Sequence, residues 1–391
     1  IYADTIRLVG TDKGIEVNLP QITYASDSLE LTADGKIILG TAIAENALSV
    51  ISESGDITLK EQIGADIVTL TSSDALINEG DIVGIQVNLS AENMDNRGTM
   101  YSDTMDIRLF DSLSNTGILS AYTNLTVTAA DMINGTGALI ESQDVALDIS
   151  HSVKNMGTFH AGFLALHTPT LLNEQNIIAD TLQIESSSLI NNALLKGDNI
   201  LSVDTQALIN NGGMIGRNLL AIQADTITNN EVLYSANAID LSAADTLRNT
   251  EGSTIRSEGS INIHDTGTIR NEAANIDADG NIIIQAETLE NLSSTVPTKS
   301  SVSSSSKVTV KMSGKWRDKK TTDTTRDTIN KTGYDSAYIL AGGDMSIDAT
   351  MHNRYSMIAA DGDLYLSGSL NNDSDIEAHT IVDTMHYVQH K

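Results

Sequence analysis

The chain has 391 residues, with 23 Lys and Arg against 52 Asp and Glu, which gives a formal net charge of −29. This acidity excludes a general nucleic-acid-binding protein, because such proteins need a cationic surface for the phosphates. The chain has no cysteine, which excludes disulfide frameworks and thiolate metal sites, and no apolar run approaches the roughly 18 residues of a membrane span.

The first segment, residues 1–77, repeats a rhythm of short apolar runs separated by glycine. Residues 14–19, 29–39 and 55–59 each alternate apolar and polar side chains. Period-two alternation bounded by Gly, Asp and Ser predicts short β-strands joined by tight turns. We expect this segment to be the end of a regular β-helix that merges into the next segment.

The second segment, residues 78–292, is marked by an asparagine that returns every 18 to 22 residues. An apolar residue stands one or two positions before it, and a glycine often follows shortly after it, as in Leu113-Ser114-Asn115-Thr116-Gly117. Self-similarity at this period is typical of solenoids, in which each repeat buries its apolar face only against its neighbours. The repeating asparagines are Asn78, Asn96, Asn115, Asn134, Asn155, Asn173, Asn191, Asn210, Asn229, Asn249, Asn271 and Asn291.

The period and the alternation together predict an all-β fold, a right-handed parallel β-helix. Runs such as residues 238–243 and 260–264 alternate over four to six residues, so a coil of about nineteen residues holds three short strands. Helical solenoids need longer repeats with a 3.6-residue periodicity, which is absent. Aromatic residues make up only 4% of the chain, which fits a narrow core of Ile, Leu, Val and Ala. Twenty such coils would form a rod about 95 Å long.

The repeating asparagines have a structural explanation. Equivalent asparagines in stacked coils form an amide ladder, in which each side chain bonds to those above and below it. Asparagine also suits the corner where one strand passes to the next. We therefore expect no catalytic or binding role for these twelve residues.

The third segment, residues 293–333, breaks the pattern and reverses the charge. It is rich in Ser and Thr, and its nine Lys and Arg against three Asp give 9 − 3 = +6, while the rest of the chain carries 14 − 49 = −35. We expect a β-hairpin or loop that projects from the rod. One interpretation is a contact surface, in which Trp316 is an aromatic anchor and the cations bind phosphate or carboxylate. The other is a solvated loop, or a hairpin that pairs with acidic coils. The candidate receptor-binding residues are Lys307, Lys311, Lys315, Trp316, Arg317, Lys319, Lys320 and Arg326.

The last segment, residues 334–391, returns to the strand rhythm, and we expect resumed β-helix coils. Residues 339–347 and 357–366 alternate as before, and Met351-His352-Asn353 repeats the asparagine motif.

Some parallel β-helices cleave polysaccharides with a pair of carboxylates on one face. The sequence offers Asp103 with Asp106, Asp144 with Asp148, and Asp361 with Asp363. Each pair fits solvated turns equally well, so we expect a non-enzymatic protein. No histidine pair has the spacing of a metal site, and we expect neither a metal nor a cofactor.

The coil pattern resembles a known family. Apolar-Asn-x-Gly coils of about nineteen residues, the unit Ala341-Gly342-Gly343-Asp344 and residues 14–19 are similar to filamentous-haemagglutinin repeats of exoproteins exported by two-partner secretion. Within that class the layout resembles effectors of contact-dependent growth inhibition of the CdiA type. The resemblance implies that residues 1–77 end a regular haemagglutinin segment and that residues 78–292 belong to a receptor-binding region. It also implies an outer-membrane transporter as the secretion partner, and a toxin carried by a C-terminal region beyond Lys391.

These expectations combine into one hypothesis. The chain would be a monomeric rod, secreted and displayed on the bacterial cell surface, that binds an outer-membrane receptor of a neighbouring bacterium for toxin delivery. The basic segment favours a lipopolysaccharide core over a protein receptor. A host-cell adhesin and a polysaccharide lyase or glycosidase are the alternatives.

Overall fold

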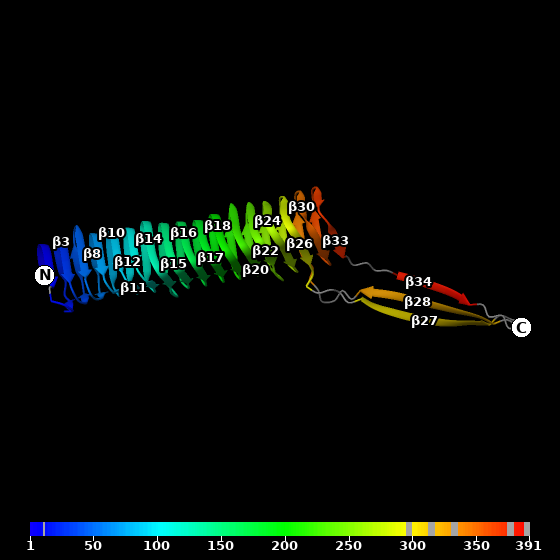
Figure 1. Cartoon of the computed structure of the whole chain (residues 1–391), viewed down its shortest axis with the longest axis horizontal. Coiled ribbons are helices and arrows are strands. Elements are labelled where there is room, and N and C mark those ends of the chain that lie inside the picture. Colours follow the sequence, from blue (N-terminus) through cyan, green and yellow to red (C-terminus); the bar gives the residue numbers. More distant parts are fainter. Residues whose placement is uncertain (11, 295–298, 312–316, 330–334, 374–378, 387–391) are drawn as a thin grey trace.

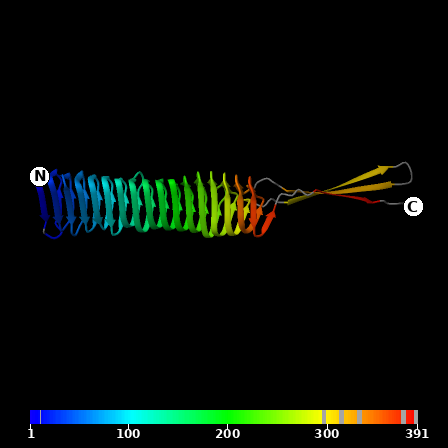
Figure 2. The ribbon, with the colours of Figure 1, turned by 90° about the horizontal axis from the view of Figure 1, so that it is seen from above.

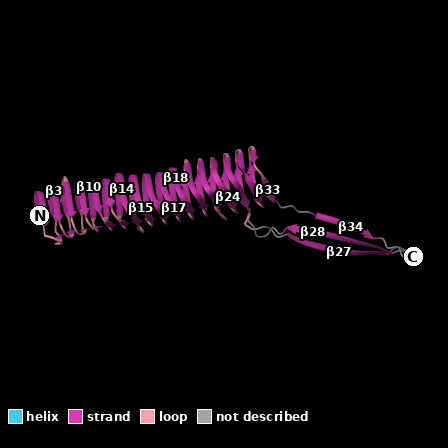
Figure 3. Ribbon diagram, viewed as in Figure 1, coloured by secondary structure: helices cyan, strands magenta, loops and turns pink. Residues whose placement is uncertain are grey.

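The computed structural model describes residues 1–10, 12–294 and 335–373, and the backbone of residues 299–311, 317–329 and 379–386. The chain forms a right-handed parallel β-helix of about 17 turns, the fold class that the sequence predicts (Figures 1 and 2). The described residues form strands, bends and turns and no helix, so they contain no helix that could cross a membrane (Figure 3).

The strands follow the coils from one end of the rod to the other. The first are Tyr2–Gly10 (β1), Val17–Leu19 (β2), Thr23–Ala33 (β3), Ile37–Leu39 (β4), Ala42–Ala44 (β5), Ala47–Ser52 (β6), Ile57–Leu59 (β7), Ile63–Ser72 (β8) and Ala75–Asn78 (β9). The middle coils contain Asp81–Ala91 (β10), Asn93–Asn96 (β11), Thr99–Leu109 (β12), Ser112–Asn115 (β13), Ile118–Asn134 (β14), Leu139–Asn155 (β15), Thr158–Asn173 (β16), Ile177–Asn191 (β17), Leu194–Asn210 (β18), Gly213–Gly216 (β19), Leu219–Asn229 (β20), Val232–Ser235 (β21), Ala238–Asn249 (β22), Thr254–Ser257 (β23), Ser260–Glu272 (β24), Asn275–Ala278 (β25) and Ile282–Leu292 (β26). The remaining strands are Lys299–Lys311 (β27), Arg317–Ile329 (β28), Tyr338–Ala341 (β29), Met345–Arg354 (β30), Met357–Ala360 (β31), Leu364–Ser367 (β32), Leu370–Asp373 (β33) and His379–His386 (β34).

Each coil has three faces, which we call first, middle and last in chain order. In the coil of β10 and β11 these are residues 81–84, 86–91 and 93–96, each paired in parallel with the coils before and after it. In β14 to β18 the faces run together into one long strand per coil, and shifts of register mark some of the corners. Stacked strands lie about 4.8 Å apart, so about 17 coils span about 80 Å.

The core is a narrow aliphatic column. On the middle face, side chains such as Val127, Leu147, Leu166 and Ile184 stack in register and are almost fully buried. Phe159 is the only aromatic side chain among the described residues that is fully buried. The low aromatic content of the chain follows from this geometry, because each coil leaves room for only a few branched aliphatic side chains.

The twelve repeating asparagines form a continuous amide ladder at the end of the last face. From Asn78 to Asn291, each side-chain nitrogen donates to the side-chain oxygen of the next asparagine at 2.8 to 3.0 Å, and every one of them is fully buried. Many of these nitrogens also donate to a backbone carbonyl on the C-terminal side, as Asn210 does to Val232 at 3.2 Å. Asn353 and Asn372 continue the ladder.

The asparagines of the ladder occupy one column of equivalent positions in the stacked coils. The first segment differs from the second in the residue that fills this column. Leu59 pairs with Asn78 in register, and Leu39 and Leu19 occupy the same position in the two coils before it. Leucines therefore fill the column in residues 1–77 and asparagines fill it from Asn78 onward. The side-chain oxygen of Asn78 has no hydrogen-bond partner, because its neighbour towards the N-terminus is a leucine.

The third segment leaves the solenoid and returns to it at one place. Ser294 and Asp335 are joined by two hydrogen bonds of 2.9 Å, one between backbone groups and one from the Asp335 backbone nitrogen to the Ser294 hydroxyl. β29 then pairs with β25, and β30 pairs with β26, so the coil register continues across the interruption. β27 and β28 form the antiparallel pair that the sequence analysis expected as a hairpin.

The structure differs from the sequence analysis at the end of the chain. Coils resume only through Asp373, whereas residues 379–386 form β34, which pairs antiparallel with β28 and not with a coil. β27, β28 and β34 make a separate three-stranded sheet that extends beyond the last coil (Figures 1 and 2). The rod is therefore shorter than twenty coils, because the strands of this sheet add no turn to it.

Candidate functional site

The candidate receptor-binding cations lie mainly on the separate sheet. Lys307 and Lys311 are on β27, and Arg317, Lys319, Lys320 and Arg326 are on β28. In the antiparallel register Lys311 is opposite Arg317 and Lys307 is opposite Thr321. Lys315 and Trp316, the proposed aromatic anchor, lie outside the described residues.

Of the acid pairs singled out in the sequence, Asp144 and Asp148 lie too far apart for a catalytic carboxylate pair. Asp144 and Asp148 lie four residues apart on one strand, which corresponds to about 13 Å. Glycoside hydrolases need roughly 5 to 9.5 Å between their two carboxyl groups. Asp106 forms an ion pair with Arg108, and Asp363 accepts a hydrogen bond from the Tyr365 hydroxyl at 3.0 Å.

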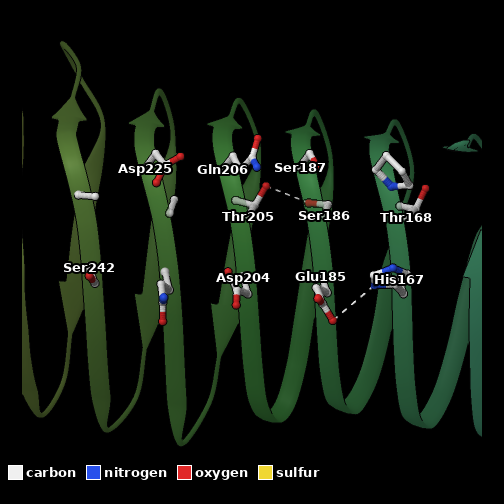
Figure 4. Close-up of a pocket in the computed structure, with 14 residues that line it drawn as sticks. His167, Thr168, Glu185, Ser186, Ser187, Asp204, Thr205, Gln206, Asp225 and Ser242 are labelled. Atoms are coloured by element: carbon white, nitrogen blue, oxygen red, sulfur yellow. Dashed lines mark hydrogen bonds and ion pairs between the residues drawn. The ribbon is translucent and has the colours of Figure 1, made fainter. Parts of the chain in front are cut away.

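A groove lies on the middle face of β14 to β22. Two adjoining hollows of about 410 and 400 Å³ share the side chains of His167, Glu185 and Asp204, which stand between them. These three residues come from the consecutive strands β16, β17 and β18 and project from the same position of each coil (Figure 4). We call these two adjoining hollows the central groove.

Side-chain size along two outward rows explains why the surface is concave here. The polar row consists of Asp148, His167, Glu185, Asp204 and Gln223, which are neighbours in register. The row beside it carries Ala146, Ala165, Gln183 and Ser202, most of which are short. On the other side of the polar row, the bottom of the groove is lined by the buried residues Thr168, Thr205 and Ala224.

The central groove is acidic and rich in hydrogen-bonding groups. No Lys or Arg lines it, whereas Asp148, Glu185, Asp204 and Asp225 do. His167 Nδ1 lies 3.4 Å from a Glu185 carboxylate oxygen, and the Ser186 hydroxyl donates to Thr205 Oγ1 at 2.9 Å (Figure 4). Glu185 and Asp204 are in register on adjacent coils, so their backbones are about 4.8 Å apart.

A third hollow, of about 390 Å³, lies at the corner between the first and middle faces of β14 to β17. Its edge carries Tyr122, which is 79% exposed, and its lining includes Glu141, Gln143, His160 and Asp180. Half-buried Phe163 occupies the first position of the middle face in β16, between this corner and the central groove. We call this third hollow the corner hollow.

A fourth hollow, of about 300 Å³, lies on the last face next to the base of the insertion. It is lined by Arg270, His352, Arg354 and Asp373, among others. Arg270 Nε is already paired with Glu272 at 2.8 Å and with Glu290 at 3.2 Å. This hollow is therefore partly neutralised by its own acids.

Titratable groups elsewhere on the described coils show one clear perturbation in the physiological range. The pKa of His264 is raised above its ordinary value by the hydrogen bond from its ring to Asp265 at 2.9 Å and by the negative charge of Asp240, and partial burial opposes this. No group of three His, Asp or Glu residues in the described part of the chain is placed to hold a metal ion.

The central groove was not predicted from the sequence, although the sequence contains a signal for it. Counting back from the ladder asparagines gives 173 − 167 = 6, 191 − 185 = 6, 210 − 204 = 6 and 229 − 223 = 6. His167, Glu185, Asp204 and Gln223 therefore share one offset and must stack. The acid pairs considered in the sequence were close in the chain, whereas neighbours in a solenoid are one coil apart.

Comparison with known proteins adds no name to this geometry. No protein-family model, no curated protein and no solved structure matches the chain. The filamentous-haemagglutinin resemblance therefore rests on the coil period and on motifs such as residues 341–344.

Proposed function

We propose that the chain is a non-enzymatic recognition segment of a secreted, surface-displayed filamentous protein. It binds an outer-membrane receptor on a neighbouring bacterium and brings a toxin to that cell. The receptor is lipopolysaccharide or an outer-membrane protein, and we favour the lipopolysaccharide core. A rod of stacked coils suits this role, because it holds a binding surface at a fixed distance from the cell that displays it.

The observation that carries the proposal is the separation of charge between the acidic coils and the basic insertion. The insertion has a net charge of +6, the rest of the chain has −35, and six of the candidate cations lie on the sheet beyond the last coil. Clustered Lys and Arg bind phosphate through short, charge-assisted hydrogen bonds. The phosphate groups of a lipopolysaccharide core are ligands of this kind, whereas the acidic coils would repel them.

The test is binding of the purified chain to whole Gram-negative cells that carry either a complete or a truncated lipopolysaccharide core. One variant has Lys307, Lys311, Lys319 and Lys320 changed to Gln. A matched control has Lys36, Lys60, Lys154 and Lys196, which all lie on coils, changed to Gln, so both variants have the same net charge.

Loss of binding to truncated cells and by the insertion variant alone would support the proposal. Equal binding by both variants would move the contact to the coils and favour a protein receptor. Binding to eukaryotic cells and to no bacterium would instead favour the host-cell adhesin.

A polysaccharide-cleaving enzyme stays the second candidate because of one observation, the pairing of Glu185 and Asp204 on adjacent coils within a groove. Retaining glycosidases hold their two carboxyl groups about 5 to 5.5 Å apart, close to the spacing of stacked strands. Release of reducing ends from polysaccharides by the chain, abolished by Glu185→Gln and by Asp204→Asn, would establish this activity. Absence of release from every polysaccharide tested would leave the recognition role.

A further inference from the structure

Three of the hollows on the described surface lie on one side of the same coils. The central groove follows the middle face from β14 to β22, and the corner hollow borders it at β14 to β17. We propose that this side of the rod binds an uncharged glycan, a chain of pyranose sugars that lies along the solenoid axis. The inference does not depend on the cationic insertion, which lies outside these coils.

The spacing of polar groups favours an extended chain over a compact small molecule. The polar row places one hydrogen-bonding side chain on each coil, from Asp148 through His167 and Glu185 to Asp204 and Gln223. Consecutive members are about 4.8 Å apart, which is comparable to the length of one pyranose residue in an extended chain. Each sugar can therefore meet the same kind of group as the sugar before it.

The chemistry of the lining favours hydroxyl groups as the ligand's contacts. Carboxylates accept two hydrogen bonds in one plane, and Gln side chains both donate and accept, which matches adjacent sugar hydroxyls. Glu141, Gln143 and Asp180 in the corner hollow repeat the combination seen at Glu185 and Gln223. The aliphatic residues of the lining are the small Ala146 and Ala165 and the almost fully buried Leu147, Leu166 and Ile184, so the groove offers no large exposed aliphatic side chain to an apolar helix.

Aromatic side chains supply the apolar contact that a sugar ring needs. Tyr122 is 79% exposed beside the corner hollow, and Phe163 is half-buried between that hollow and the central groove. An aromatic face packs against the C–H groups of a pyranose ring, and the Tyr hydroxyl remains available for a hydrogen bond. These are the two exposed or half-buried aromatic side chains on this side of β14 to β17.

Charge decides which glycans fit. Neither the central groove nor the corner hollow is lined by any Lys or Arg, and together they present Asp148, Glu185, Asp204 and further carboxylates. An anionic polysaccharide would meet like charges at close range, which costs free energy. The ligand class is therefore an uncharged glycan, unlike the phosphate groups proposed for the insertion.

The test is binding of the full chain to immobilised neutral gluco-, galacto- and manno-oligosaccharides, with sulfated and sialylated oligosaccharides as anionic comparisons. Tyr122→Ala removes the exposed aromatic ring. Ala165→Tyr fills the groove from its outer surface, where Ala165 is half-buried and the strand accepts an aromatic residue. Asn88→Tyr is the matched control, because Asn88 is half-buried at the equivalent middle-face position of β10, away from the groove.

We expect at least one neutral oligosaccharide to bind, with affinity reduced about tenfold or more by Tyr122→Ala and by Ala165→Tyr and unchanged by Asn88→Tyr. Circular dichroism identical to that of the parent chain would show that the two groove variants fold. Binding to no neutral oligosaccharide, binding to anionic ones alone, or equal affinity of the Ala165→Tyr variant would overturn the proposal. A protein ligand that the groove variants lose, with no glycan bound, would overturn it as well.

The two proposals fail separately. Changing Lys307, Lys311, Lys319 and Lys320 to Gln removes binding to cells if the proposed receptor contact is right. The same change leaves the affinity for the oligosaccharide unchanged. The groove variants Tyr122→Ala and Ala165→Tyr lower the affinity for the oligosaccharide and leave the proposed receptor contact of the insertion intact.

Discussion

Asn191 donates its side-chain amide to the side-chain oxygen of Asn210 across 2.8 Å, although the two residues are one full coil apart in the chain. Asn210 donates in turn to Asn229 at 2.8 Å, and all three are fully buried. A residue in this column is therefore both donor and acceptor to its neighbours. The loss of Asn210 leaves the buried side-chain oxygen of Asn229 without its donor and removes one acceptor from the amide of Asn191.

We expect Asn210→Ala to destabilise the surrounding coils by about 2 to 4 kcal/mol, because each buried polar atom left unpaired costs about 1 to 3 kcal/mol. The adjacent Asn211 is the control: it bonds to Asn192 and Asn230 in the same ladder fashion, but on the exposed surface. Asn211→Ala should change stability by less than about 0.5 kcal/mol. Amide hydrogen exchange of β17 to β20 measures both, and similar effects of the two changes would contradict the assigned role of the buried ladder.

Gly98 lies in a turn where consecutive coils approach closely. A Cβ atom at Gly98 would lie 1.9 Å from the carbonyl oxygen of Gly80, and one at Gly117 would lie equally close to that of Gly98. We expect Gly98→Ala to cost about 2 kcal/mol or more, because backbone atoms must move. A Cβ at Gly213 would meet only the end of the Leu194 side chain at 3.3 Å, so Gly213→Ala should be nearly neutral. Thermal unfolding of the two variants checks this, and equal melting temperatures would count against it.

The hydrogen bonds between Ser294 and Asp335 predict that the solenoid tolerates removal of the insertion. Replacing residues 295–334 by a short Gly-Ser linker should leave far-ultraviolet circular dichroism per coil residue and the exchange protection of β25, β26, β29 and β30 unchanged, since these strands pair across the interruption. β34 would lose its partner strand β28 and become susceptible to proteases. Loss of protection in β30 would show that the insertion is needed to hold the last coils.

The raised pKa of His264 predicts that the stability of the coils around it depends on pH. Its pKa is raised in the folded state, so folding favours the protonated ring. The resulting stabilisation is fully present below the unfolded pKa of about 6.5 and is lost as the pH rises through the higher folded value. Hydrogen exchange of β22 and β24 should therefore slow as the sample is acidified through this window, after correction for intrinsic exchange, and His264→Gln should abolish the change. The histidine-free coils of β10 and β12 serve as the internal reference, and a matching change there would rule out His264 as its cause.

Much of the fold is readable from the chain because its strongest signals are periodic. The asparagine column fixes the coil length, and each coil can only stack on its neighbour, so Asn78 to Asn291 predict both the fold and the register. The end of the chain was harder. Residues 379–386 contain the apolar residues Ile381, Val382 and Met385 but no asparagine motif, and their partner is β28 in the insertion, a long-range pairing that no local pattern predicts.

The candidate site was less predictable for a different reason. The central groove arises where Ala146, Ala165 and Ser202 are short beside the taller polar row, a relation between residues one coil apart and between adjacent rows. Exposed positions in a solenoid carry no constraint from the core, so neither hydrophobic patterning nor motif spacing marks them. Alignment of the coils on their asparagines is required before the groove can be recognised.

The direction of the amide ladder also has a consequence for how the rod grows. Every nitrogen points towards the next coil in the chain, and the oxygen of Asn78 faces the leucine that precedes the ladder. A partly formed rod therefore always displays an open N–H donor at its C-terminal end, which acts as a template for the asparagine of the following coil. A chain that emerges N-terminus first can add its turns one at a time in the order of synthesis, each captured by the turn completed before it.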